Sequence, residues 1–270
     1  MAAVIFNTIS LSLTVLISLL LSHNVNSLSF DFPTFDSYNN AISFQGDAFA
    51  SQGFLQLTKT INGVPQPNSA GRASYSAPVH LWDAKTGKLA AFTTSFSFML
   101  SPSSSSYPSL FGDGISFFIA PFNSHIPSNS SGGFLGLFSE PTALNSYANR
   151  IVAVEFDTFG NPWDPTSSGH IGIDVNSIAS VKTVSWNAEK GLTGIATISY
   201  DPDVKSLNVY VRYPTESKVN RTSSSTSLMF VVDLRTLLPE WVRVGFSGAT
   251  GHLVELHKIL SWDFVSSNFY

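Results

Sequence analysis

The chain has no cysteine among its 270 residues, and only 12% of its residues are charged. The missing cysteines exclude disulfides, thiol chemistry and cysteine-ligated zinc, so the fold must be stabilised by core burial, which a chain of this length can supply. Low charge together with a 43% hydrophobic composition excludes a disordered chain and indicates a folded domain with a large core.

Basic residues are also few. The chain has 14 Lys and Arg and 18 Asp and Glu, which gives a net charge of −4. They are scattered along the chain, so the sequence offers no basic patch. We therefore expect no nucleic-acid partner.

The first 27 residues carry no Asp, Glu, Lys or Arg. An apolar run over Ile9–Leu21 and a polar stretch up to Ser27 predict a signal peptide (1–27) that is cleaved before Leu28. An uncleaved anchor is the alternative, but the run is shorter than the ~20 apolar residues that span a bilayer. We expect no membrane insertion, and a mature domain at 28–270 with N-glycosylation sequons at Asn129 and Asn220.

Strand patterns recur along the whole mature chain. Apolar and polar residues alternate over Phe92–Phe98, Ser206–Arg212 and Trp241–Phe246, and turn-forming residues separate such segments. The helical candidate of note is the short Asp233–Leu238, which Pro239 ends. Length alone would allow two domains, but the pattern favours one all-β sandwich or barrel.

A cluster of acidic residues follows one of these strands. If 152–157 is a strand, its period of two places Glu155 and Asp157 on one face and Val154 and Phe156 on the other. Neighbouring carboxylates repel each other, so a bound cation or a shared proton must neutralise them. These two answers correspond to a metal-dependent binding protein and an acid-base enzyme.

The residues that follow favour the cation. Asp157, Asn161 and Asp164 are spaced too widely for one strand face and need a loop, after which His170 returns on the next strand. Carboxylate and amide oxygens suit Ca²⁺, whereas an imidazole beside carboxylates suits Mn²⁺. Separate surface carboxylates and a core histidine are the simpler alternative. A sandwich glycosidase would carry a third carboxylate where Phe159 stands, which disfavours catalysis.

At these residues the chain resembles the legume lectin family, and the resemblance covers nearly all of 28–264. It rests on many segments in the family's order, at residues 29–32, 71–73, 92–98, 112–121, 132–138, 152–178, 238–242, 245–251 and 260–262. The resemblance implies a single-domain jelly-roll β-sandwich that binds carbohydrate and has no enzymatic activity.

The resemblance also implies a pair of bound ions. Mn²⁺ would be held by an imidazole and three carboxylates, those of His170, Glu155, Asp157 and Asp164. Ca²⁺ would be held by oxygen atoms alone, from Asp157, the Phe159 carbonyl, Asn161 and Asp164. Ser180 would order a water molecule bound to Mn²⁺.

The sugar site is implied in the same way. Asp113 would accept hydrogen bonds from two sugar hydroxyls, following a Gly112–Asp113 peptide bond that is commonly cis in the family. Further contacts would come from the Gly133 N–H, the Asn161 side chain and the ring of Phe159. Without the resemblance, Gly133 is interpreted as a tight-turn glycine and Phe159 as a core ring. The last contacts would come from His252 and Leu253, in a short loop like that of mannose/glucose-binding members.

Glycans of glycoproteins or polysaccharides are therefore the expected partners, bound by a homodimer or homotetramer in the secretory pathway, either extracellular or vacuolar. Two other functions stay open. One is a defence or storage protein of the same fold that has reduced or lost sugar binding, and the other is a glycosidase on a similar sandwich.

Overall fold

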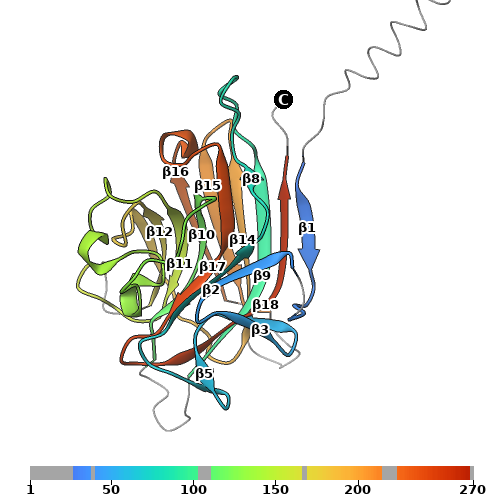
Figure 1. Ribbon diagram of the computed structural model, residues 1–270. Coiled ribbons are helices and arrows are strands. Elements are labelled where there is room, and N and C mark those ends of the chain that lie inside the picture. The colour runs from blue at the N-terminus through green and yellow to red at the C-terminus, as the bar shows by residue number, and fades with distance from the viewer. Residues whose placement is uncertain (1–26, 38–39, 103–110, 166–168, 215–223, 268–270) are drawn as a thin grey trace, which may run out of the picture.

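The computed structural model describes residues 27–37, 40–102, 111–165, 169–214 and 224–267. The predicted signal peptide, except for its last residue, and Asn220 lie outside these ranges. The described part consists of two antiparallel sheets packed face to face, with three short 3₁₀ helices (Figure 1). The predicted all-β sandwich is confirmed.

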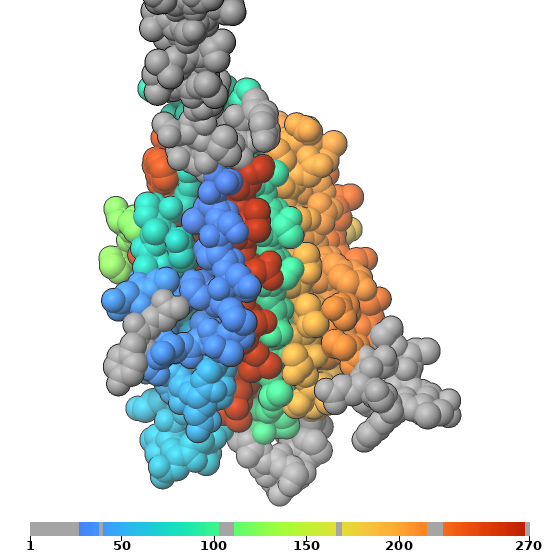
Figure 2. All heavy atoms as spheres, turned by 90° about the vertical axis from the view of Figure 1, so that its right-hand side faces the viewer, coloured from blue at the N-terminus to red at the C-terminus, as the bar shows by residue number. Residues whose placement is uncertain are grey.

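The first sheet has eight strands. In spatial order they are β16 (Ser225–Val231), β15 (Ser206–Arg212), β14 (Thr193–Asp201), β9 (Phe92–Pro102), β18 (Glu255–Ser266), β4 (Phe54–Gln56) and β3 (Phe49–Ser51), with β1 (Ser29–Phe32) paired to β18. Figure 2 shows the outer face of this sheet, where β1, β18, β9 and β14 run side by side. The two ends of the described chain therefore pair with each other.

The second sheet also has eight strands and carries the predicted site. In spatial order they are β13 (Lys182–Ser185), β12 (His170–Val175), β11 (Val152–Asp157), β10 (Gly114–Pro121), β17 (Trp241–Ala249), β7 (Ala70–Tyr75) and β2 (Ile42–Gly46), with β8 (Val79–His80) paired to β17. A separate hairpin is formed by β5 (Thr60–Ile61) and β6 (Val64–Pro65).

The main core lies between the sheets and is rich in phenylalanine. Phe96 on β9 packs against Phe117 on β10, Phe156 on β11 and Phe246 on β17, with ring centroids 4.7–6.3 Å apart. All four rings are almost fully buried. These contacts join the sheets through stacked and edge-on aromatic pairs, which add to the energy of area burial.

A second, smaller cluster covers the outer face of β10 and β11. It contains Phe118 and Ala153 from the strands and Leu135, Phe138 and Ile151 from the segment between them. Both strands are consequently buried on both faces. Polar residues on the outer face of β11 are therefore enclosed by this segment instead of facing water.

The covering segment is held in place by a buried arginine. Arg72 on β7 donates hydrogen bonds to the carbonyls of Gly136 (2.7 Å), Leu137 (3.2 Å) and His125 (3.3 Å). Burial lowers the pKa of Arg72 to about 9, and Arg243 adds to this effect. The arginine thereby fixes the loop that contains the 3₁₀ helix η1 (Gly132–Phe134) against the sheet.

The predicted helical segment forms only one 3₁₀ turn, η3 (Leu234–Thr236), which Asp233 caps by accepting a hydrogen bond from the Arg235 N–H at 3.2 Å. The sequence did not predict η1 or η2 (Glu140–Thr142), since each spans three residues and shows no helical period.

Candidate functional site

Strands β11 and β12 place the predicted acidic cluster. Glu155 and Asp157 are 1% exposed and lie on the outer face of β11, opposite the core face of Val154 and Phe156. The strand register sets His170 beside Asp157, and the His170 Nε2 lies 2.9 Å from the Glu155 Oε1. The strand pairing therefore brings together side chains that are 15 residues apart.

The loop after β11 is organised by its own carboxylates. The Phe159 N–H donates to Asp157 Oδ1 at 2.7 Å, and the Asn161 N–H donates to Asp164 Oδ2 at 2.5 Å. The Asp164 N–H returns a bond to the Asn161 carbonyl at 3.1 Å. These bonds fold the loop so that Asp164 comes back toward the start of the loop.

The electrostatics of this cluster are unfavourable without a counter-charge. Burial raises the pKa of Asp157 well above its usual value, and the charges of Glu155 and Asp164 raise it further. Burial also raises the pKa of Asp164 to about 6. Burial alone would lower the pKa of His170, but the hydrogen bond and charge of Glu155 outweigh it and raise that pKa. A cation in this position would remove the repulsion.

Two residues that the sequence analysis did not assign as ligands complete the cluster. Asp174 is fully buried on β12, and the Ser180 hydroxyl lies 2.6 Å from the Asp174 Oδ1 and 2.5 Å from the Glu155 Oε1. The Ser180 hydroxyl has a single proton, so it donates to only one of these two carboxylates at a time. Burial, and then the charge of Glu155, raise the pKa of Asp174. The sequence does contain a signal for Asp174, because it lies four residues after His170 and therefore on the same face of the strand.

Gly172 lies between His170 and Asp174 on β12 and pairs with Glu155 on β11. A Cβ at Gly172 would collide with the Ser180 hydroxyl and with the Glu155 side chain. Glycine at this position therefore creates the space in which Glu155, Ser180 and Asp174 meet.

Asp113 lies at the neighbouring strand end. The Gly112–Asp113 peptide bond is cis, and the Asp113 side chain is 5% exposed. Its Oδ2 is buried without a hydrogen-bond partner and faces Gly251, where an added Cβ would lie 3.0 Å away. Burial raises the pKa of Asp113 to about 6, while the Gly251 backbone N–H and the charge of His257 oppose the rise.

The residues around Asp113 come from three different loops. A Cβ at Gly133 would collide with the Asn161 side chain, whose Oδ1 is buried without a partner. The Thr158 N–H donates to the Asp113 carbonyl at 3.0 Å. Phe159 lies against Gly112 and is 37% exposed, so its ring is not a core ring.

The third loop follows β17. Its start is tied to η1 because the Gly132 N–H donates to the Thr250 carbonyl at 3.0 Å. His252 is exposed and Leu253 is half-buried. The structure therefore gathers Asp113, Gly133, Phe159, Asn161 and the loop of His252 and Leu253 at one end of the second sheet.

The sequence analysis also missed a buried network beside this site. Glu255 and His257 on β18 are fully buried, and the His257 Nε2 lies 3.0 Å from the Glu255 Oε1. The His257 Nδ1 lies 3.0 Å from the Thr58 hydroxyl. The alternation of Glu255 and His257 with apolar residues would have signalled a shared face, but not its burial.

Two further predictions concern a glycosylation site and the absence of membrane insertion. Asn129 is exposed in a left-handed turn with φ 52°. Within the described ranges, no helix is long and apolar enough to cross a membrane.

Comparison with known proteins agrees with this arrangement. The legume lectin domain family matches residues 27–269. The chain belongs to the legume lectin family. Members of this family bind carbohydrate and are not enzymes, so this lectin is a non-catalytic carbohydrate-binding protein with the jelly-roll fold of the family.

The relatives match over almost their full length. Lectin 7 of Medicago truncatula is 59% identical over 95% of this chain and 96% of its own. A mannose/glucose-specific lectin of Centrolobium tomentosum is 47% identical over 91% of this chain and 98% of its own. Among solved structures, the lectin UEA-II complexed with galactose is 45% identical, covers 91% of this chain and 100% of its own, and superposes with a TM-score of 0.81.

Proposed function

We propose that the lectin binds mannose/glucose-type glycans in a Ca²⁺- and Mn²⁺-dependent manner at the strand end that carries Asp113. The observation that carries the proposal is the buried Asp113 Oδ2, which has no protein partner and faces the glycines of the neighbouring loops. A buried acceptor of this kind costs free energy unless a ligand donates to it. Sugar hydroxyls are suitable donors.

Each residue of the proposed site offers a different contact to a pyranose. Asp113 accepts bonds from two hydroxyls, while Asn161 and the Gly133 N–H donate to others. The half-exposed ring of Phe159 stacks on an apolar sugar face. His252 and Leu253 close the site through their backbone N–H groups.

The proposed ions use the cluster on β11 and β12. Glu155, Asp157, Asp164 and His170 hold Mn²⁺, and Asp157, the Phe159 carbonyl, Asn161 and Asp164 hold Ca²⁺. The fit is supported by the mutually repelling buried carboxylates and by the Asn161 Oδ1, which lacks a partner. The ions supply positive charge, and the chain then holds Phe159 and Asn161 in a fixed place beside Asp113.

The preference for mannose and glucose rests on the short loop between β17 and β18. The specificity of the Centrolobium tomentosum relative supports it. Galactose is the competing ligand, because the structurally similar UEA-II was solved with that sugar.

We further propose a secreted or vacuolar protein that acts as a homodimer or homotetramer on glycan-coated surfaces, after removal of residues 1–27. One shallow site with a millimolar monosaccharide affinity corresponds to about −4 kcal/mol, so multivalency is needed for tight binding. A defence or storage protein without sugar binding is the alternative, and the unpartnered Asp113 Oδ2 argues against it.

The test is a glycan array of the mature chain with Ca²⁺ and Mn²⁺ or with EDTA. Binding to mannosides and glucosides that EDTA abolishes is expected. Asp113→Ala should remove binding without unfolding the domain, whereas Asp203→Ala, in an exposed turn of the first sheet, should have no effect. A preference for galactosides would overturn the specificity, and no glycan binding at all would support the alternative function.

A further inference from the structure

A second group of potential metal ligands lies away from the proposed sugar site. His80, Asp83 and Glu240 each offer one ligand atom, and the three atoms lie within 4.8 Å of one another. Among the described residues, this is the one group of three His, Asp or Glu side chains whose ligand atoms lie this close to one another. The predicted cluster on β11 and β12 is not gathered so tightly.

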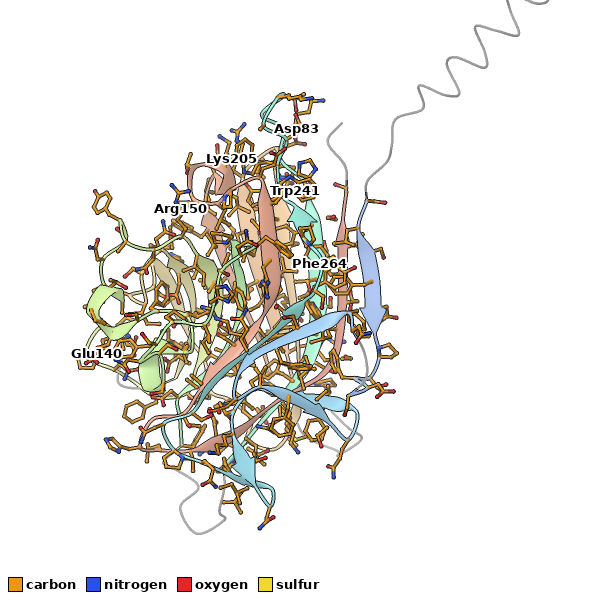
Figure 3. The ribbon with its side chains drawn as sticks, in the orientation of Figure 1. Asp83, Glu140, Arg150, Lys205, Trp241 and Phe264 are labelled. Carbon is orange, nitrogen blue, oxygen red and sulfur yellow. The ribbon has the colours of Figure 1, made fainter. Side chains whose placement is uncertain are left out.

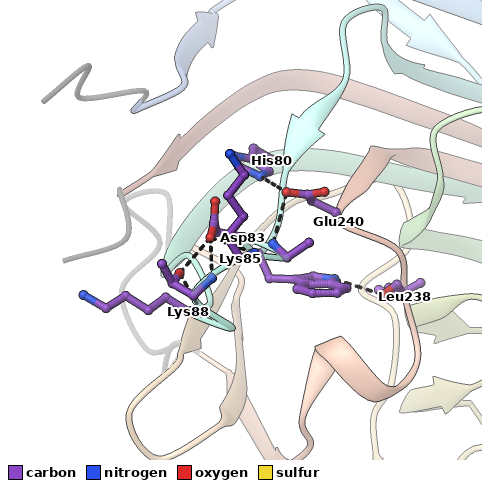
Figure 4. A network of polar contacts seen from close by, with 9 residues as sticks. His80, Asp83, Lys85, Lys88, Leu238 and Glu240 are labelled. Atoms are coloured by element: carbon purple, nitrogen blue, oxygen red, sulfur yellow. Dashed lines mark hydrogen bonds and ion pairs between the residues drawn. The ribbon is translucent and has the colours of Figure 1, made fainter.

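The three side chains are fixed by separate parts of the fold (Figure 4). His80 ends β8, and Glu240 directly precedes β17, with which β8 pairs. The Leu81 N–H donates to the Glu240 carbonyl at 2.8 Å. Asp83 begins a tight turn that the Gly87 N–H closes by donating to the Asp83 carbonyl at 2.8 Å.

The side chains are also held in suitable orientations. The His80 ring stacks on Trp241 with centroids 4.2 Å apart and an interplanar angle of 8°. The His80 Nε2 lies 2.9 Å from the Glu240 Oε1. Two atoms that share a tetrahedral Zn²⁺ at ordinary bond lengths are about 3.3 Å apart. The imidazole and the Glu240 carboxylate already have nearly this separation.

The charges of the cluster fit a divalent ion. The hydrogen bond from His80 and the Ala84 N–H lower the pKa of Glu240, and hydrogen bonds from the Thr86 backbone and hydroxyl lower the pKa of Asp83. Both carboxylates are therefore ionised at neutral pH, as metal binding requires. A single divalent ion cancels the negative charges of these two carboxylates.

The donor set selects the kind of ion. Ca²⁺ and Mg²⁺ prefer oxygen ligands and gain little from an imidazole, whereas Zn²⁺ and similar transition ions bind one imidazole and two carboxylates well. Lys85 and Lys88 belong to the same turn (Figure 4) and reduce the purely electrostatic attraction of a hard cation. Selectivity must therefore come from the His80 nitrogen.

We propose that His80, Asp83 and Glu240 form a Zn²⁺-type transition-metal site that is separate from the sugar-binding end. The eight residue steps of β17 from Trp241 to Ala249 place it about 27 Å from the sugar-binding end. Figure 3 shows Asp83 and Trp241 together at one end of the molecule, away from Glu140 in the segment that covers β10 and β11. The site is independent of the proposed sugar specificity.

The bound ion would join β8 and the turn after it to the start of β17. Because the ion binds the folded chain through three positions that are not preformed in the unfolded chain, it stabilises the folded state. Water molecules fill the remaining coordination positions at this half-exposed site.

The test is calorimetric Zn²⁺ titration of the mature protein in saturating Ca²⁺ and Mn²⁺. The wild type should bind one Zn²⁺ more than His80→Gln, and Glu240→Gln and Asp83→Asn should weaken that site at least ten-fold. His125→Gln changes an exposed histidine elsewhere and should leave the titration unchanged. Equal Zn²⁺ stoichiometry in the wild type and His80→Gln would overturn the proposal and leave His80 and Glu240 as an ion pair only.

A second measurement uses the wild type alone and does not depend on the folding of any variant. Addition of one equivalent of Co²⁺ to the Ca²⁺- and Mn²⁺-loaded, isotope-labelled wild type should broaden the indole resonance of Trp241 first. An indole resonance of Trp241 that Co²⁺ leaves unchanged would contradict a separate site, whereas resonances near His170 give no test because paramagnetic Mn²⁺ already broadens them.

Discussion

The Thr158 hydroxyl donates a hydrogen bond of 2.7 Å to the Oε1 of Glu255. Thr158 directly follows β11 and opens the loop of Phe159 and Asn161, whereas Glu255 begins β18 directly after the loop of His252 and Leu253. One buried carboxylate therefore joins the two loops between which the proposed sugar site lies.

Thr158→Val should weaken both the fold and the site. The change keeps the shape of the side chain and removes the donor, which leaves a buried carboxylate with one partner fewer at a cost of about 1–3 kcal/mol. We expect a lower urea midpoint and a several-fold loss of sugar affinity by calorimetry. Thr60→Val on the β5–β6 hairpin is the matched control. Unchanged affinity in Thr158→Val would show that the loops are positioned independently.

Gly133→Ala should abolish sugar binding through a steric effect. The added Cβ would overlap the Asn161 side chain, so either the η1 loop or Asn161 must move. We expect at least a ten-fold loss of affinity. Gly63→Ala is the control, because that position is open, and its φ of +78° should cost only about 1 kcal/mol of stability. Wild-type affinity in Gly133→Ala would remove Gly133 and Asn161 from the site.

Sugar affinity should fall as the pH is lowered through about 6. Burial raises the pKa of Asp113 to about 6, and only the ionised carboxylate accepts hydrogen bonds on both oxygens. Calorimetric titration with a mannoside between pH 5 and 8 measures the effect. Metal content must be measured at each pH, because loss of Ca²⁺ or Mn²⁺ would also reduce binding. Constant affinity over this range, with the ions retained, would contradict the assignment of Asp113.

The metal-free protein should be less stable at pH 7.5 than at pH 5. Burial raises the folded-state pKa of Asp157 and Asp164, so the folded state binds more protons than the unfolded state above the ordinary aspartate pKa. Stability is therefore lost as the pH rises through about 6. Thermal unfolding in EDTA at both values measures this, and addition of Ca²⁺ and Mn²⁺ at pH 7.5 should restore the melting temperature. A metal-free protein that is more stable at pH 7.5 would refute the argument.

The sequence predicted β11 because its period of two separates Glu155 and Asp157 from Val154 and Phe156, and such a pattern depends only on neighbouring residues. It could not predict that both faces of β11 are buried. That burial depends on the segment between β10 and β11, which is irregular and is held by Arg72 from a distant strand.

The same limit applies to the polar networks. The contacts of Ser180 with Glu155 and of Thr158 with Glu255 each join a loop residue to a strand residue, 25 and 97 positions apart in the sequence. No local pattern encodes such contacts. The positions of Asp113, Gly133 and Asn161 were expected only because the chain resembles a known family.

Gly114 on the central strand β10 pairs with Asp157 on one side and with Ala249 on the other. Each proposed recognition loop is therefore attached to its own strand, and the register of both strands is fixed by the same neighbour. Residues can be inserted after Gly251 without a shift in either ladder, since a longer surface loop costs little closure entropy. This architecture allows the ligand preference to diverge, by evolution or by engineering, while the ion-binding scaffold stays unchanged.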